Sequence, residues 1–428
     1  MNRYIALILL LTAAGAAYAE VPLPEFSTEY ELPETSVPAP AAVLYDYLDV
    51  VLLAVALLIA AWLALRKRSR RGLVVLGLVS LAYFGFWRMG CVCPIGAIQN
   101  VAMALGPGGY AVPTTVAAFF LLPLLAALLF GRVFCAGVCP LGALQDIVLL
   151  RPVRLPEWLR HALSVLPFIF LGLAVVFAVM AGPFIICQYD PFVRIFRLSG
   201  SAAAIAFGAV FVALSAVVAR PYCRFLCPYA VLLSWMSRVA KWHVTITPDE
   251  CIQCRLCEDS CPFDAIRKPS TQPVGRTEGK KLLVVLLVLL PVMAAVAALP
   301  GYWAGDLLAR ADQTVRTADL VWQNELTKPE ITPDEVTAFA RTGRPAGGLY
   351  AEAAAIVKDY RVAGLVFGAW AGLVIGGKLI ALSIRRTRSD YEPDRAHCLS
   401  CGRCFEYCPR ERMRHARTVE TSDEQPAG

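Results

Sequence analysis

The chain has 428 residues, of which 58% are hydrophobic and only 17% carry a formal charge. Its mean hydropathy of +0.59 excludes an ordinary soluble domain. The net charge of +7 arises from lysines and arginines in short clusters beside apolar runs, which is typical of membrane topology and not of a nucleic-acid-binding surface. We therefore expect a polytopic helical membrane protein with a lipid bilayer around it and no nucleic-acid partner.

The N-terminal segment is typical of a secretory signal. Arg3 precedes an apolar run over residues 4–14, and Ala17-Tyr18-Ala19 is a small-x-small cleavage site. We expect residues 1–19 to be a signal peptide, with an uncleaved anchor as the alternative. Residues 20–44 are rich in proline and acidic side chains and predict an extended extracytoplasmic leader.

Apolar runs long enough to cross a bilayer recur along the chain. Basic clusters follow the first, third, fifth and seventh runs, whereas the short opposite connections carry only Arg88, Arg194 and Arg197. The positive-inside rule then places the N-terminus outside and the C-terminal segment in the cytoplasm, in a bacterial inner membrane. The expected fold is an all-α bundle of about seven spans, at residues 45–65, 72–87, 114–130, 163–181, 202–219, 282–299 and 362–383.

Two copies of one cysteine run, C-x-x-C-x-x-C-x-x-x-C-P, carry the strongest chemical signal. In two-cluster ferredoxins, such a run gives three thiolates to one 4Fe-4S cluster and its fourth cysteine to the other cluster. A zinc ribbon is the alternative, but it usually shows two C-x-x-C pairs. We therefore expect one 4Fe-4S cluster on Cys251, Cys254, Cys257 and Cys408, and a second on Cys398, Cys401, Cys404 and Cys261.

The two runs lie on either side of two expected spans, and both emerge on the cytoplasmic face. They can therefore meet as one small α+β ferredoxin-like module that the two spans split. Within the insertion between those spans, Thr332-Pro333-Asp334-Glu335 predicts a helix start. The expected organisation is a five-span domain at 45–243, ferredoxin half 1 at 244–275, a span at 282–299, an extracytoplasmic insertion at 300–361, a span at 362–383, ferredoxin half 2 at 384–415 and a disordered tail at 416–428.

A second set of cysteines stands at the cytoplasmic ends of two spans. Each pair has the spacing C-x-x-x-C-P, and cysteines four residues apart share one face of a helix. Four thiolates from neighbouring helix ends suit a third Fe-S cluster; buried cysteines that only pack the helices are the alternative. The residues of this inner set are Cys135, Cys139, Cys223 and Cys227.

A third set is expected on the opposite face. The element Cys-Pro-x-Gly-Ala-x-Gln beginning at Cys93 repeats the one beginning at Cys139, which indicates an internal repeat. This outer set is one thiolate short of four, so we expect either a fourth Fe-S site completed by an aspartate or a structural role. Its members are Cys91, Cys93, Cys187 and Asp190.

These motifs resemble the NosR/NapH type of membrane ferredoxin over roughly residues 83–409. The resemblance implies electron delivery or quinol oxidation in anaerobic-type respiration. Residues 20–44 replace the flavin-binding domain of NosR, and the sequence lacks the flavinylation signature, so no covalent FMN is expected. No haem is expected either, because C-x-x-C-H is absent and all four histidines lie outside the expected spans.

The function expected from the sequence is electron transfer between a cytoplasmic or quinol side and an extracytoplasmic acceptor. The redox partners would be a flavoprotein, a cytochrome or an extracytoplasmic reductase, and no residue is predicted to be catalytic. The alternatives are a quinol dehydrogenase subunit or a metal-reducing assembly factor for a respiratory metalloenzyme. The copper reductases of the latter kind lack the Gly-Ala-x-Gln element that follows Cys-Pro here.

Overall fold

The structure is a computed structural model. It describes residues 43–90, 93–106, 109–180, 182–197, 202–246, 251–270, 276–327, 333–384, 388 and 390–413. The expected signal peptide, nearly all of the leader, the C-terminal tail and Cys91 lie outside the described residues.

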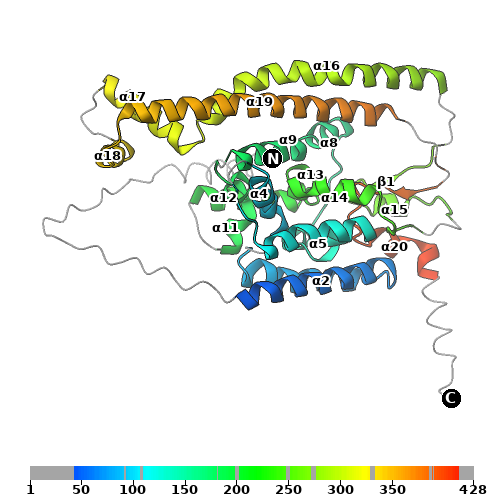
Figure 1. Cartoon of the computed structure of the whole chain (residues 1–428). Coiled ribbons are helices and arrows are strands. Elements are labelled where there is room, and N and C mark those ends of the chain that lie inside the picture. The colour runs from blue at the N-terminus through cyan, green and yellow to red at the C-terminus, as the bar shows by residue number, and fades with distance from the viewer. Residues whose placement is uncertain are drawn as a thin grey trace, which may run out of the picture.

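The N-terminal half is a bundle of long apolar helices joined by short ones (Figure 1). Several short helices begin at the proline of a Cys-Pro or Asp-Pro pair, because proline is well suited to the first helical position. In chain order the elements are α2 (Val43–Leu65), α3 (Arg70–Ser80), the π-helix η1 (Leu81–Trp87), α4 (Pro94–Ala104), α5 (Thr114–Phe130), α6 (Val133–Gly137), α7 (Pro140–Val148), α8 (Glu157–Leu163), α9 (Leu166–Val179), α10 (Ile185–Tyr189), α11 (Pro191–Arg197), α12 (Ala202–Ser215), α13 (Pro221–Phe225) and α14 (Pro228–Arg238).

The C-terminal half consists of a long helical hairpin flanked by two small segments. The expected short helix is confirmed, but it begins one residue later than expected: Pro333 is at the N-cap position and not the first helical residue, which is Asp334. The elements are α15 (Leu256–Asp259), β1 (Ile266–Arg267), α16 (Arg276–Ala309), α17 (Gln313–Thr327), α18 (Asp334–Arg341), α19 (Ala346–Ser383), β2 (Glu392–Pro393) and α20 (Arg403–Tyr407).

Five helical segments are long and apolar enough to cross a membrane, which indicates a helical membrane protein. A sixth is possible if the bent pair of α11 and α12 is one span, and α5 is apolar but only 17 residues long. All seven expected spans coincide with apolar helices, yet the count of seven stays a prediction. The five segments are Leu44–Leu65, Arg70–Trp87, Glu157–Val179, Lys281–Ala309 and Ala346–Ser383.

Glycines let α16 and α19 pack backbone to backbone. A Cβ on Gly364 would overlap the carbonyl oxygen of Gly301, and one on Gly368 would overlap that of Ala297. Small residues at four-residue spacing are the usual means of close approach between membrane helices. The hairpin then rests on α9, where Trp370 Nε1 donates a hydrogen bond to the carbonyl of Phe168 at 3.0 Å.

The two segments that carry the ferredoxin-like runs meet in an antiparallel two-stranded sheet. Ile266 of β1 pairs with Pro393 of β2, and Arg267 pairs with Glu392. Figure 1 shows β1, α15 and α20 together at one end of the bundle, with α17 and α18 at the opposite end. The fold therefore joins segments that the whole α16–α19 hairpin separates in sequence.

Candidate metal centres

The two ferredoxin-like runs have the same backbone conformation. Gln253 and Arg255 have positive φ angles of 52° and 64°, and their equivalents Ser400 and Gly402 have φ angles of 53° and 79°. Positive φ is uncommon for residues other than glycine. Its repetition at matching positions indicates that both loops are held in the same specific conformation. In both runs the second of these residues is the N-cap of a short helix, α15 or α20.

Each run gathers its own first three cysteines with the fourth cysteine of the other run. Cys257 interacts electrostatically with Cys251, Cys254 and Cys408. In the same way, the neighbours of Cys404 are Cys398, Cys401 and Cys261. The structure thus brings together the two sets predicted from the spacing, including the exchange of fourth cysteines. We call the set around Cys257 the distal head set and the set around Cys404 the proximal head set.

The proximal head set lines one cavity, which provides a test of fit for a cluster. All four of its cysteines face this cavity, together with apolar side chains such as Val244 and Phe263. Burial raises the pKa of Cys398 to about 12 and that of Cys257 to about 11. Iron takes the thiolate form, so binding would displace these protons. Among the described residues, no three His, Cys, Asp or Glu side chains are placed to hold a single metal ion. A 4Fe-4S cluster does not require this arrangement, because each thiolate bonds to a different iron.

The inner set is gathered from four short helical segments. Cys139 interacts with Cys223 and Cys135, and Cys227 interacts with all three. Cys135 lies in α6 and Cys223 in α13, whereas Cys139 and Cys227 are the N-caps of α7 and α14. Cys135, Cys139 and Cys227 are buried, and all four are free thiols.

Polar groups surround the sulfurs of the inner set. Gln145 Nε2 donates a hydrogen bond to Cys223 Sγ at 3.2 Å, and Arg132 Nη2 lies 3.8 Å from Cys135 Sγ. The backbone amide of Gly142, in the first turn of α7, interacts with Cys139. Donors of this kind stabilise thiolate ligands and tune the potential of a bound cluster.

Two buried arginines connect the inner set to the proximal head set. Arg220 is 1% exposed, pairs with both carboxylate oxygens of Asp146 at 2.9 and 2.6 Å, and acts electrostatically on Cys223 and Cys401. Arg132 donates to the carbonyl of Ala396 at 3.2 Å and acts on both Cys223 and Cys398. Neither arginine was predicted from the sequence to be part of a metal centre. The only available signal was an arginine three residues before the first cysteine of each inner pair, and the positive-inside rule already accounted for both arginines.

Three of the four members of the outer set, Cys93, Cys187 and Asp190, lie in the described part of the chain. Cys93 interacts with Asp190 and Cys187, and a Cβ on Gly96 would stand 3.2 Å from Cys187 Sγ. Asp190 is 4% exposed and precedes Pro191 at the start of α11, where its Oδ1 accepts a hydrogen bond from the amide of Phe192 at 2.8 Å. Asp190 thus stands before its helix as Cys227 stands before α14. Cys91 lies outside the described residues.

The internal repeat extends to the segments that the two Gly-Ala-x-Gln elements contact. Gln145 Oε1 accepts a hydrogen bond from the amide of Tyr222 at 3.3 Å, and Gln99 Oε1 accepts one from the amide of Ile186 at 2.9 Å. Tyr222 directly precedes Cys223, and Ile186 directly precedes Cys187. Both glutamines are buried and hold a second cysteine segment against the first. The inner and outer sets are therefore two versions of one arrangement.

Comparison with known proteins identifies iron–sulfur domains in the chain. A family model described as a 4Fe-4S binding domain (Fer4_5) matches residues 112–165 and 201–247, and a second 4Fe-4S binding domain (Fer4) matches residues 244–267. The first match contains all four cysteines of the inner set, and the second contains the first ferredoxin-like run. The chain thus contains 4Fe-4S binding domains.

Five known proteins are similar to this chain, among them the following three. "Uncharacterized protein MJ0750" of Methanocaldococcus jannaschii is 29% identical over 190 residues, which are 42% of this chain and 77% of that protein. "Putative electron transport protein YccM" of Escherichia coli K12 is 26% identical over 189 residues, 40% of this chain and 52% of that protein. "Uncharacterized protein MJ0749" of M. jannaschii is 28% identical over 152 residues, 33% of this chain and 56% of that protein.

The chain therefore spans about half the length of the last two relatives. No solved structure matches. Together, the matched domains and the relative described as an electron transport protein support an iron–sulfur electron-transfer role.

Proposed function

We propose that the chain carries single electrons across a membrane along four cysteine sets in a fixed order: distal head, proximal head, inner and outer. The observation that carries this proposal is that neighbouring sets are linked by shared residues or by direct interaction of their cysteines. A bound 4Fe-4S cluster supplies reversible one-electron transfer. The residues of this chain would hold the four sets in succession and surround the inner sulfurs with polar donors.

The links can be followed from one end to the other. The two head sets exchange Cys261 and Cys408, so they share both runs. The proximal head set and the inner set share Arg220, whose charge acts on Cys401 and Cys223. Cys139 of the inner set interacts with Cys93 of the outer set, and both line one cavity with Asp190.

The need for several positions follows from distance. The hydrocarbon core of a bilayer is about 30 Å thick, which is too far for one efficient electron-tunnelling step. Because Cys139 and Cys93 line one cavity, the inner and outer sets lie close together within the bundle. The succession from the head sets through these two sets divides the distance into shorter steps. The burial of Cys135, Cys139 and Cys227 keeps water from these three sulfurs of the inner set.

The finer features of the proposal rest on the sequence. The head sets would lie in the cytoplasm and the outer set at the extracytoplasmic face of a bacterial inner membrane, because basic clusters follow the odd-numbered spans. The donor would be a cytoplasmic carrier or quinol and the acceptor an extracytoplasmic redox protein of anaerobic-type respiration, as the resemblance to NosR/NapH-type ferredoxins implies. Contact of the two runs through β1 and β2 supports their emergence on one face.

The number and position of the clusters can be measured on the purified protein. Three complete sets of four cysteines predict about 12 irons and 12 acid-labile sulfides per chain, and about 16 of each if the outer set is also filled. Reduced wild-type protein should show the EPR signals of interacting clusters. Cys139→Ser should remove the inner signal and retain the head signals, whereas Cys257→Ser should remove the distal head signal and retain the inner one. A content of about eight irons, unchanged by Cys139→Ser, would restrict the clusters to the head.

A further inference from the structure

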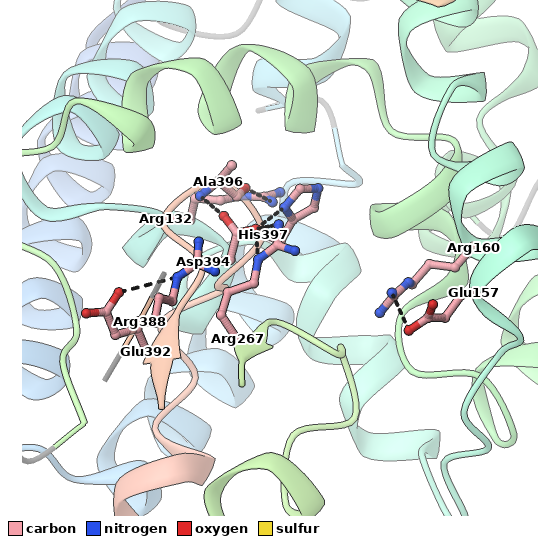
Figure 2. Close-up of polar contacts among 9 residues, drawn as sticks. All are labelled: Arg132, Glu157, Arg160, Arg267, Arg388, Glu392, Asp394, Ala396 and His397. Carbon is pink, nitrogen blue, oxygen red and sulfur yellow. Dashed lines mark hydrogen bonds and ion pairs between the residues drawn. The ribbon is translucent and has the colours of Figure 1, made fainter. Parts of the chain in front are cut away.

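A large cavity opens between the membrane helices and the head and is not used by the four cysteine sets, although Cys223 touches its wall. Its volume is about 1500 Å³. Its walls come from α8 and α9, from α14, from the C-terminal third of α19 and from the loop that precedes α20. Figure 2 shows Arg160 of α8 on one side of this space and Arg267, Asp394 and His397 on the other. The cavity therefore lies at the end of the spans, where the expected cytoplasmic boundary of the membrane falls.

Positive charge exceeds negative charge in this cavity. Its four carboxylates are already engaged: Asp394 pairs with Arg267 and His397, Asp264 with Arg224 at 3.3 Å, and Glu392 with Arg388 at 3.7 Å. The fourth, Asp390, is not free either. The lining also contains Arg238 and Lys378. Within the described part of the chain, neither of these two cations has a carboxylate at ion-pair distance. Lys378 also lies in the fields of Arg160, Arg267 and Arg238, which only Asp394 is seen to oppose.

The membrane side of the same cavity is apolar and aromatic. Phe168, Trp235 and Trp370 form a row with ring centroids 6.1 and 6.3 Å apart. Leu373, Val374, Ala381 and Leu382 extend this wall along α19. The cavity thus has one cationic half and one apolar half, in the order in which a lipid headgroup and its chains meet at a membrane boundary.

We propose that this cavity binds one anionic phospholipid, with its phosphate between Arg238 and Lys378 and its acyl chains against Trp235 and Trp370. Basic pockets between membrane helices at the cytoplasmic boundary suit anionic headgroups. A neutral isoprenoid ligand would not neutralise the excess positive charge, and a small soluble anion would not cover the aromatic wall. A bound lipid would fill the space between the hairpin and the head, so it would also hold the head against the bundle.

The test is native mass spectrometry of the purified full chain, carrying its clusters, after delipidation in detergent. Four probes are added separately: phosphatidylglycerol, phosphatidylcholine with the same acyl chains, glycerol phosphate and a neutral quinone. One phosphatidylglycerol per chain should be retained in preference to phosphatidylcholine, and glycerol phosphate should not displace it. Each of Arg238→Gln and Lys378→Gln should weaken phosphatidylglycerol binding about fivefold.

Two variants serve as matched controls because they remove the same charges elsewhere on the membrane helices. Arg71→Gln on α3 and Lys281→Gln on α16 change exposed cations that do not line the cavity, so they should leave lipid binding unchanged. Equal binding of the two phospholipids, or loss of phosphatidylglycerol with the control variants alone, would overturn the proposal. Displacement of phosphatidylglycerol by millimolar glycerol phosphate would overturn the proposal and identify a soluble-anion site instead. Displacement of phosphatidylglycerol by a neutral quinone, with no effect of Arg238→Gln on lipid binding, would also overturn the proposal. Because iron content is measured on the same samples, failure of lipid binding is separable from failure to bind clusters.

Discussion

Arg132 lies against Cys135, with its Nη2 atom 3.8 Å from the sulfur and its Nη1 atom bonded to the carbonyl of Ala396. The arginine is 5% exposed, and its Nε has no hydrogen-bond partner among the described residues. A buried cation without a carboxylate partner is costly unless negative charge is supplied nearby. A reduced cluster on the inner set would supply that charge.

Replacing this cation should lower the potential of the inner cluster. Arg132→Gln removes one positive charge beside Cys135, and the reduced form, which carries the extra electron, loses more stabilisation than the oxidised form. The expected fall in midpoint potential is on the order of 60 mV, measured by an EPR-monitored redox titration. Arg132→Lys retains the charge and should shift the potential by less than half as much. An unchanged potential in the glutamine variant would place the cluster away from Arg132.

The Arg220–Asp146 pair should be important for stability. Arg220 is almost fully buried, so Asp146→Asn would leave an uncompensated cation beside the inner set. Breaking such a pair from one side typically costs about 3–5 kcal/mol of unfolding free energy. Glu335→Gln is the control, because it breaks the pair with Arg316, in which both side chains are about half exposed or more, and should cost at most about 1 kcal/mol. Thermal unfolding in detergent compares the melting temperatures of the two variants. Equally small shifts in melting temperature would show that the buried pair contributes no more to stability than the exposed pair.

Close packing in the α16–α19 hairpin should depend on Gly368. Gly368→Ala places a Cβ on top of the carbonyl oxygen of Ala297 and forces the helices apart. Gly377 lies in the same helix with no atom within 4 Å of its added Cβ, so Gly377→Ala should be neutral or stabilising by about 1 kcal/mol. The melting temperature should fall only for Gly368→Ala, and a similar fall for both would contradict the packing.

Asp190 should determine occupancy of the outer set. Asp190→Ala removes the carboxylate beside Cys93 and should lower the iron content by up to about four atoms per chain while sparing the other signals. Asp190→Cys supplies a fourth thiolate at the same position before α11 and should retain the iron with a changed EPR spectrum. If the alanine variant keeps its full iron content and all of its signals, the outer set has a structural role.

Much of the metal chemistry could be predicted from the sequence because thiolate spacing is a local property. The runs beginning at Cys251 and Cys398 specify which three cysteines share a centre, and the repeat of Gly96 and Gln99 in Gly142 and Gln145 indicates a second arrangement. The structure brings these cysteines together in the expected sets, although ligation itself stays a prediction.

The linking residues could not be predicted, because they depend on how distant segments pack. Arg132 and Arg220 follow apolar runs and satisfy the positive-inside rule, so nothing in the sequence separates them from cations that only orient the chain. Their burial results from packing of the head on α5, α6 and α13. The expected span at 114–130 has the same bounds as α5, whose C-cap Gly131 has a φ of 72°. The expected span at 202–219 is longer than α12, which ends at Ser215.

The most direct test of the electron path uses the protein in sealed proteoliposomes, with an impermeant reductant outside and a trapped impermeant oxidant inside. Wild-type protein should reduce the trapped oxidant. Cys139→Ser removes a ligand of the inner cluster and should lower the rate of this reduction at least about 100-fold, which is the scale of effect known for residues that support a metal site. The head clusters of this variant should remain reducible. Full transfer by Cys139→Ser would show that electrons do not pass through the inner set.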